Sequence, residues 1–133
     1  MYKRKKMNGA TVTAIEQTVV DSIYALEKIG GLEELLRCLI LIPSLDESAL
    51  CSALTTYANG FLYQKTGFLL EQLNESFRLP SSFFAFCKEH IPRADRYLTK
   101  EHSDYIYYPA WRLIGPRDIT KLINKGVTDY DAI

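Results

Sequence analysis

The sequence predicts a mainly α-helical domain with minor β content (α+β class), built of about five to six helices. Short strands are expected near the N-terminus and in an aromatic segment near the C-terminus. Three observations support this: 133 residues suit one domain, apolar residues recur at helical spacing over most of the chain, and strand-forming residues gather near both ends. We expect a basic arm or linker at residues 1–8, followed by a single domain at residues 9–133.

The first elements are a strand and two helices. The alternating, β-branched segment Gly9–Ala14 predicts a short strand. A helix is predicted over Glu16–Ile29, and Gly30–Gly31 is its C-terminal stop. The next helix, Leu32–Ile42, is apolar on more than one face, which favours a buried position.

Two further helices are predicted in the middle of the chain. Pro43 ends the second helix, and Ser44 with Glu47 has the form of a capping box, which predicts the start of a third helix. The Asn59–Gly60 pair ends it. A fourth helix is expected over about Phe61–Phe77.

The last third of the chain changes character. Pro80–Ser82 begins a short phenylalanine-rich helix that ends at Ile91–Pro92. The segment Tyr105–Ile114 is aromatic and β-prone, and Pro109 divides it into two short extended pieces. The remaining predicted elements are a turn at Gly115–Pro116 and an amphipathic helix over Arg117–Lys125.

The charge of the chain is balanced, with 16 basic and 16 acidic residues. No global field therefore gathers nucleic acid or an anionic membrane. The densest basic run is Lys3, Arg4, Lys5 and Lys6, and two interpretations stay open for it: a solvated terminus, or an arm that contacts phosphate. No apolar run is long enough to span a bilayer or to act as a signal peptide, which predicts no membrane contact and a cytoplasmic protein.

The cysteines and histidines predict neither a metal site nor a cofactor. Cys38, Cys51 and Cys87 are widely spaced in apolar helical segments, which favours core thiols in a reducing compartment. Cys87 and His90 have one ligand-like spacing, but no second pair completes a tetrahedral site.

The stretch Gln64–Gly67, QKTG, raises the question of phosphate binding. A phosphate-binding loop needs glycine before Lys-Ser/Thr, after a strand, whereas here Lys65 and Thr66 precede Gly67 within a helix. We expect Gly67 to let a neighbouring helix approach, which offsets its cost of about 1 kcal/mol relative to Ala. Lys65 is expected to be an exposed contact for a partner.

Two more residues have a structural and a functional interpretation. Asp21 interrupts an apolar stripe and is expected to brace backbone amides or an arginine, because a catalytic role has no second group in support. Trp111, beside Tyr107, Tyr108 and Arg112, suits either a stacking platform for bases or, as favoured, a core anchor. The sequence thus predicts no catalytic residues and no enzyme.

Four segments together resemble a known family. TAIEQTVVDSI, GLEELLRCLILIPSLDESALCSAL, LYQKTGFLLEQL and WRLIGP, in this order, are similar to the C-terminal domain of AbiEi-type antitoxins. These belong to abortive-infection, type IV toxin–antitoxin systems of bacteria. The similarity covers roughly Gly9–Pro116, and its motifs are patterns of apolar and small residues rather than catalytic signatures.

The resemblance implies a non-enzymatic transcriptional regulator and antitoxin. In that family an N-terminal winged helix binds promoter DNA, and the C-terminal domain supports repression and counters a nucleotidyltransferase-like toxin encoded nearby. Nothing before Gly9 could form a winged helix, so promoter binding would need one that is missing, and Lys3 to Lys6 would be the remnant of a linker. The alternative is a stand-alone protein- or nucleic-acid-interaction module without a toxin partner.

The resemblance also bears on the first predicted helix. Glu16 and Asp21 fall where the family has a Glu-Arg-Thr run followed by Asp, but Gln17 stands in place of the arginine. An internal ion pair is therefore expected to be lost. Both acidic residues are interpreted as structural.

Overall fold

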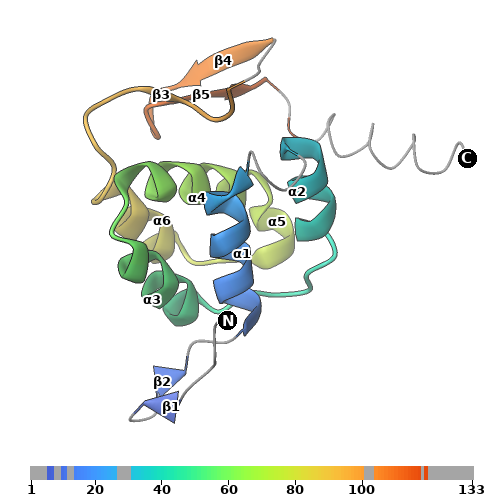
Figure 1. Ribbon diagram of the computed structural model, residues 1–133, viewed down its shortest axis with the longest axis vertical. Coiled ribbons are helices and arrows are strands. Elements are labelled where there is room, and N and C mark those ends of the chain that lie inside the picture. The colour runs from blue at the N-terminus through green and yellow to red at the C-terminus, as the bar shows by residue number, and fades with distance from the viewer. Residues whose placement is uncertain are drawn as a thin grey trace, which may run out of the picture.

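The computed structural model describes residues 6–7, 10–11, 14–26, 31–100, 104–117 and 119 of the chain (Figure 1). The described residues form helices with a small amount of sheet, so the predicted mainly α fold with minor β content is confirmed. The helices are α1 (Ala14–Tyr24), α2 (Leu32–Leu39), α3 (Glu47–Tyr57), α4 (Gly60–Gln72), α5 (Asn74–Phe77) and α6 (Ser81–Lys88). The strands are β1 (Lys6–Met7), β2 (Ala10–Thr11), β3 (Arg96–Tyr97), β4 (Tyr105–Tyr108) and β5 (Leu113–Pro116).

Helix α4 is the centre of the fold. Its nine residues from Leu62 to Leu70 are all buried, so every face of the helix is covered. Helices α1, α3, α5 and α6 contact it, and the sheet of β3, β4 and β5 lies across its other side (Figure 1). Asn59 starts α4, because its side chain accepts a hydrogen bond from the amide of Leu62 at 3.1 Å.

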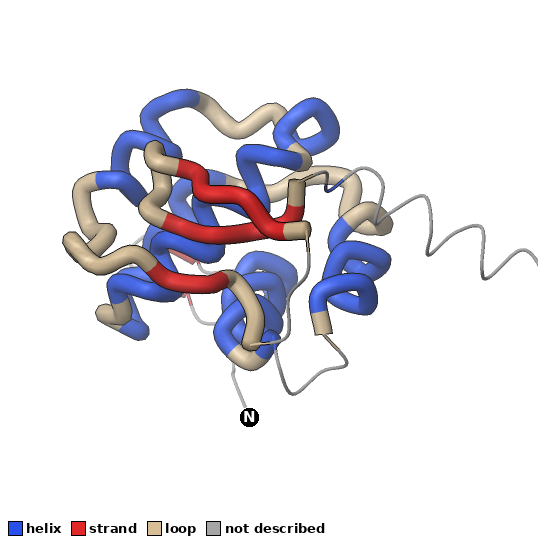
Figure 2. The backbone as a smooth tube through the Cα atoms, turned by 90° about the horizontal axis from the view of Figure 1, so that it is seen from above, coloured by secondary structure: helices blue, strands red, loops and turns tan. Residues whose placement is uncertain are grey.

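The aromatic segment contributes β4 and part of β5 to a three-stranded sheet, in the order β3-β5-β4 (Figure 2). Strands β4 and β5 confirm the two extended pieces predicted around Pro109, whereas β3, which runs parallel to β5, was not predicted. The turn predicted at Gly115–Pro116 is wrong, because both residues lie within β5. Gly115 instead permits close approach: a Cβ there would lie 3.3 Å from the Phe68 ring.

The start of α3 differs from the predicted capping box on Ser44. Asp46 is the N-cap, and its carboxylate accepts a hydrogen bond from the amide of Ala49 at 2.9 Å. Glu16 reaches over from α1 and accepts from the backbone amide of Asp46 at 2.6 Å. This long-range contact fixes the residue that caps the helix.

Other helix and strand boundaries also differ from the predicted ones. The first helix was predicted over Glu16–Ile29. In the structure this helix is α1, which begins at Ala14 and ends at Tyr24, and residues 27–30 lie outside the described part. The single helix predicted over Phe61–Phe77 is divided at Leu73 into α4 and α5. The predicted N-terminal strand contains β2, which pairs with β1. Most of the helix predicted over Arg117–Lys125 lies outside the described residues.

Candidate functional site

The QKTG stretch lies inside the molecule, at the junction between α4 and the sheet. Lys65 is only 7% exposed, so the prediction of an exposed partner contact is wrong. The sheet covers the side of α4 that would otherwise face water. The ammonium group of Lys65 lies 4.6 Å from the centre of the Phe61 ring, and the guanidinium of Arg96 lies 5.2 Å from the same ring.

Gln64 ties α4 to the sheet. Its side-chain amide donates to the backbone carbonyls of Trp111 and Arg112, at 3.1 and 2.9 Å, and lies 3.3 Å from that of Ala94. These carbonyls belong to the segments that lead into β5 and β3. A fully buried glutamine therefore satisfies backbone groups at the start of two strands. Its position in the QKTG stretch gave no signal of this role.

Gly67 packs against the indole of Trp111. A Cβ at Gly67 would lie 2.3 Å from Cζ3 of Trp111, so only glycine leaves room for the ring. Close packing was predicted correctly, but the neighbour is this side chain rather than another helix. Trp111 is 1% exposed, and its Nε1 donates to Glu71 at 2.8 Å. The core-anchor interpretation of Trp111 is confirmed, and its use as a stacking platform is wrong.

Asp21 joins α1 to α3. Its Oδ1 accepts hydrogen bonds from the Gln17 side chain at 2.9 Å and from the Tyr57 hydroxyl at 2.5 Å. Asp21 therefore braces side chains, rather than the backbone amides or the arginine that the sequence predicted. The hydrogen bond to Asp21 is the main reason why the pKa of Tyr57 rises to about 12. The donor from α1 is thus the neutral amide of Gln17, so this contact is not an ion pair.

Two thiols, Cys51 and Cys87, are unsuited to nucleophilic attack. Burial raises the pKa of Cys87 to about 12, and burial with the nearby Glu47 carboxylate raises that of Cys51 to about 11. Both thiols therefore stay protonated at physiological pH. Cys87 is a core thiol as predicted, Cys51 is half-buried, and Cys38 is exposed, which contradicts its predicted burial.

Cys87 and His90, whose spacing resembles that of metal ligands, have other roles. His90 is exposed at the end of α6, with Nδ1 2.8 Å from the carbonyl of Phe86 and its ring stacked on Tyr63 at 4.5 Å. Within the described residues, no three His, Cys, Asp or Glu side chains gather closely enough to hold a metal ion.

The outer face of the sheet presents aromatic side chains. Leu113 is fully buried and Gly115 faces Phe68, so Ile114 between them points to the opposite face. The partners of Ile114 across the sheet are Tyr97 on β3 and Tyr107 on β4, and paired residues share a face. Tyr97 and Tyr107 are 49% and 46% exposed. Figure 2, seen from above, shows the three strands in front of the helices.

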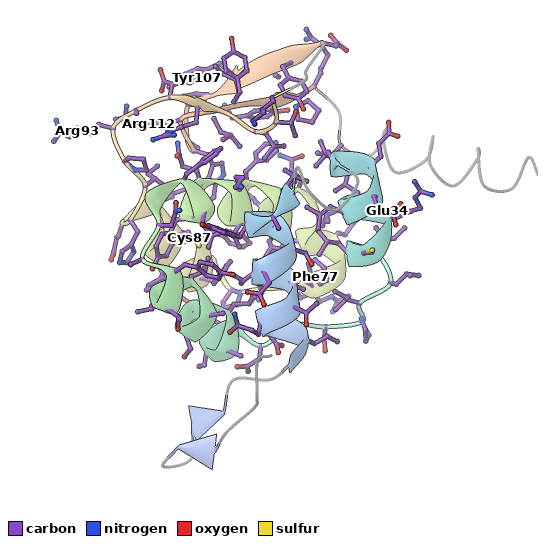
Figure 3. All side chains as sticks on the ribbon, in the orientation of Figure 1. Glu34, Phe77, Cys87, Arg93, Tyr107 and Arg112 are labelled. Carbon is purple, nitrogen blue, oxygen red and sulfur yellow. The ribbon has the colours of Figure 1, made fainter. Side chains whose placement is uncertain are left out.

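Basic side chains surround this tyrosine row of Tyr97, Ile114 and Tyr107. Arg93 and Arg112 are both exposed, and Figure 3 shows Arg93 pointing away from the body at the same end as Arg112 and Tyr107. The Tyr107 hydroxyl donates to Asp95 at 2.8 Å; this bond raises the pKa of Tyr107, and the charge of Arg112 opposes the rise. The sequence placed Tyr107 and Arg112 beside Trp111 but did not show that they lie outside while Trp111 is buried.

The basic arm is largely outside the described residues. This applies to Lys3, Arg4 and Lys5, while Lys6 begins β1 and pairs with Thr11. Contact of these four residues with nucleic acid stays a prediction.

Comparison of the chain with protein-family models, with curated proteins and with solved structures found no match. As for membranes, none of the helices in the described residues combines the length and apolar character needed to cross a bilayer.

Proposed function

We propose that this chain is a non-enzymatic antitoxin and transcriptional-regulator domain of a bacterial type IV toxin–antitoxin (abortive infection) system. In the cytoplasm it supports promoter repression and counters a nucleotidyltransferase-like toxin encoded nearby. The observation that carries the proposal is the contact between two of the resembling segments, LYQKTGFLLEQL and WRLIGP. Gly67 makes room for Trp111, and Gln64 bonds the carbonyls of Trp111 and Arg112.

This contact gives the resemblance a physical basis. The two segments are distant in the sequence, and the hydrogen bond from Gln64 to Trp111 spans 47 positions. A small residue, an amide and an indole must all be present for the sheet to sit on α4. In this chain the two segments are therefore a set of mutually dependent packing residues rather than two independent patterns.

The non-enzymatic part of the proposal is supported by what the polar residues do. Asp21 bonds Gln17 and Tyr57, and Glu16 bonds the backbone at the start of α3. Gln64 bonds carbonyls that lead into the sheet. These contacts use the polar groups to hold elements together, which suits a binding domain better than a catalytic one.

This chain alone is expected to contribute little to the binding of promoter DNA. Repression relies on a winged helix in addition to this chain, and the chain alone should bind duplex DNA weakly. Contacts from Lys3, Arg4, Lys5 and Lys6 would then add about 0.9 to the salt slope for each phosphate neutralised.

Co-expression tests the proposal. Induction of the neighbouring nucleotidyltransferase gene should stop growth of a host, and co-expression of this chain should restore it. Absence of such a gene beside the natural coding sequence, or no restoration by a chain that is expressed and folded, would refute the antitoxin proposal. The second candidate, a stand-alone interaction module, is favoured by the exposed tyrosine row, which could bind a partner without any toxin.

A further inference from the structure

We propose that the outer face of the β3-β5-β4 sheet binds single-stranded nucleic acid, with bases stacked on the tyrosine row and phosphates held by the surrounding arginines. This site goes beyond the proposed function, in which nucleic acid enters only as promoter duplex.

The shape of the face suits unpaired bases. Tyr97 and Tyr107 lie on the two strands that flank β5, so their backbones are about 10 Å apart, at two strand spacings. Two aromatic side chains on one face of the sheet therefore offer a surface for stacking. Each base of a single strand presents a free face, and stacking on aromatic side chains is the usual mode of sequence-tolerant binding.

The ring of Tyr107 is held in place. Its hydroxyl bonds Asp95, next to β3, so the side chain must extend from β4 across β5. The ring thus lies over the central strand with one face outward. A fixed ring loses little conformational freedom on binding, which favours affinity.

The charge of the segment favours a polyanion over a protein partner. Residues 93–117 contain five basic and three acidic residues, a net charge of +2 in a chain whose net charge is zero. Of the acidic residues described, Asp95 is bonded to Tyr107 and Asp104 forms an ion pair with Arg117 at 3.0 Å. Exposed Arg93 and Arg112 are left to meet phosphates, whereas the Arg96 guanidinium lies over the Phe61 ring on the other side of the sheet.

A duplex fits this face less well. The bases of a duplex are stacked inside and offer no ring face to a tyrosine. Reading a duplex from the major groove needs a protruding helix or ribbon, whereas the tyrosine row spans three paired strands of a sheet, and these strands lie across the helices (Figure 2).

Fluorescence anisotropy with labelled oligo(dT) and oligo(U) tests the site, with probes of about 15 nucleotides to match the site sizes of such surfaces. The parent for the assay is the full chain with Lys3, Arg4, Lys5 and Lys6 replaced by Ala, which removes binding through the arm. This parent should bind both probes more tightly than a duplex of equal length. No binding, or a preference for the duplex, would overturn the proposal.

Substitutions of the tyrosines test stacking. Tyr97→Ala and Tyr107→Ala should each weaken binding at least about fivefold, while Tyr97→Phe should retain it. Tyr24→Ala is the matched control, because Tyr24 on α1 is also 49% exposed. Binding unchanged by Tyr97→Ala and Tyr107→Ala, with circular dichroism showing intact folding, would rule out the tyrosine row.

Substitutions of charges test phosphate binding. Arg112 and Arg78 are both exposed and both have positive φ, 49° and 56°, but Arg78 lies at the end of α5. Arg112→Asn should weaken binding and lower the salt slope by about 0.7 for each phosphate that the arginine neutralises, whereas Arg78→Asn should do neither. Asp95→Asn should tighten binding. Equal effects of Arg112→Asn and Arg78→Asn would contradict a site on the sheet.

The co-expression assay measures whether the chain counters the toxin, and it does not depend on oligonucleotide binding by the sheet. The two proposals can therefore fail independently. Loss of oligonucleotide binding by the tyrosine variants is expected whether or not they still counter the toxin. If these variants bind the probes normally and lose only the capture of a protein, the face is a protein interface and the nucleic-acid proposal is wrong.

Discussion

Gly67→Ala is the smallest change that tests the junction between α4 and the sheet. The new methyl carbon would lie 2.3, 2.4 and 3.0 Å from Cζ3, Cη2 and Cε3 of Trp111. The indole has little freedom to withdraw, because it is buried, packs edge-on against Phe84 and bonds Glu71 through Nε1. The substitution must therefore displace a ring that is held on several sides.

The expected cost follows from three effects, one favourable and two unfavourable. Alanine gains about 1 kcal/mol over glycine within a helix. Overpacking a core costs about 1 to 3 kcal/mol, and loss of the hydrogen bond from Trp111 to Glu71 costs roughly another 1 kcal/mol. The free energy of unfolding should fall by about 1 to 3 kcal/mol, which lowers the melting temperature by about 4 to 12 °C for a chain of this size.

Trp111 is the only tryptophan, so its fluorescence reports on the same contact. Urea unfolding should show the loss of stability, and native emission should shift to the red as the indole meets water. A double-mutant cycle with Trp111→Phe is the control, because the smaller ring should relieve part of the clash and make the two costs less than additive. Gly67→Ala as stable as the parent, with unchanged emission, would refute the packing role of Gly67.

Four further substitutions test three contacts of the fold. Gln64→Leu should lower the free energy of unfolding by about 2 to 4 kcal/mol in urea, because the buried carbonyls of Trp111 and Arg112 lose their donor; stability equal to the parent would contradict this. Asp46→Ala should cost about 1 kcal/mol, while Ser44→Ala should change stability by less than about 0.5 kcal/mol, and the reverse order would place the cap on Ser44. Because the pKa of Tyr57 is raised to about 12, its bond to Asp21 should stabilise the fold fully below pH 10 and be lost between pH 10 and about 12. Tyr57→Phe should remove that part of the pH dependence in alkaline unfolding curves, and an identical dependence in both proteins would exclude the bond.

The sequence predicted the helices well because their apolar spacing is a local property. It did not predict what surrounds α4, because Lys65 is buried by a sheet whose strands lie about 30 residues or more after Lys65 in the chain. Hydrophobic periodicity cannot show what covers a helix from a distance. The same limit explains Gly67, where a close neighbour was expected but its identity, Trp111, was not.

Three other differences have different physical causes. Ser44 and Asp46 are both good capping residues, and the choice between them depends on the contact of Glu16 with the backbone of Asp46. Strand β3 has two residues, too few to show an alternating pattern, and exists through its parallel pairing with β5. The outward direction of Tyr107 likewise depends on sheet register, which the sequence of a short aromatic segment leaves open.

The claim that this chain counters a toxin without catalysis is tested most directly by growth restoration with Asp21→Asn and His90→Gln. The assay measures growth of a host that expresses the neighbouring nucleotidyltransferase together with each variant, at matched protein levels and with folding confirmed by circular dichroism. Both variants should restore growth as fully as the parent chain. Failure of the parent to restore growth, or loss of restoration in a folded Asp21→Asn or His90→Gln variant, would contradict a non-enzymatic antitoxin.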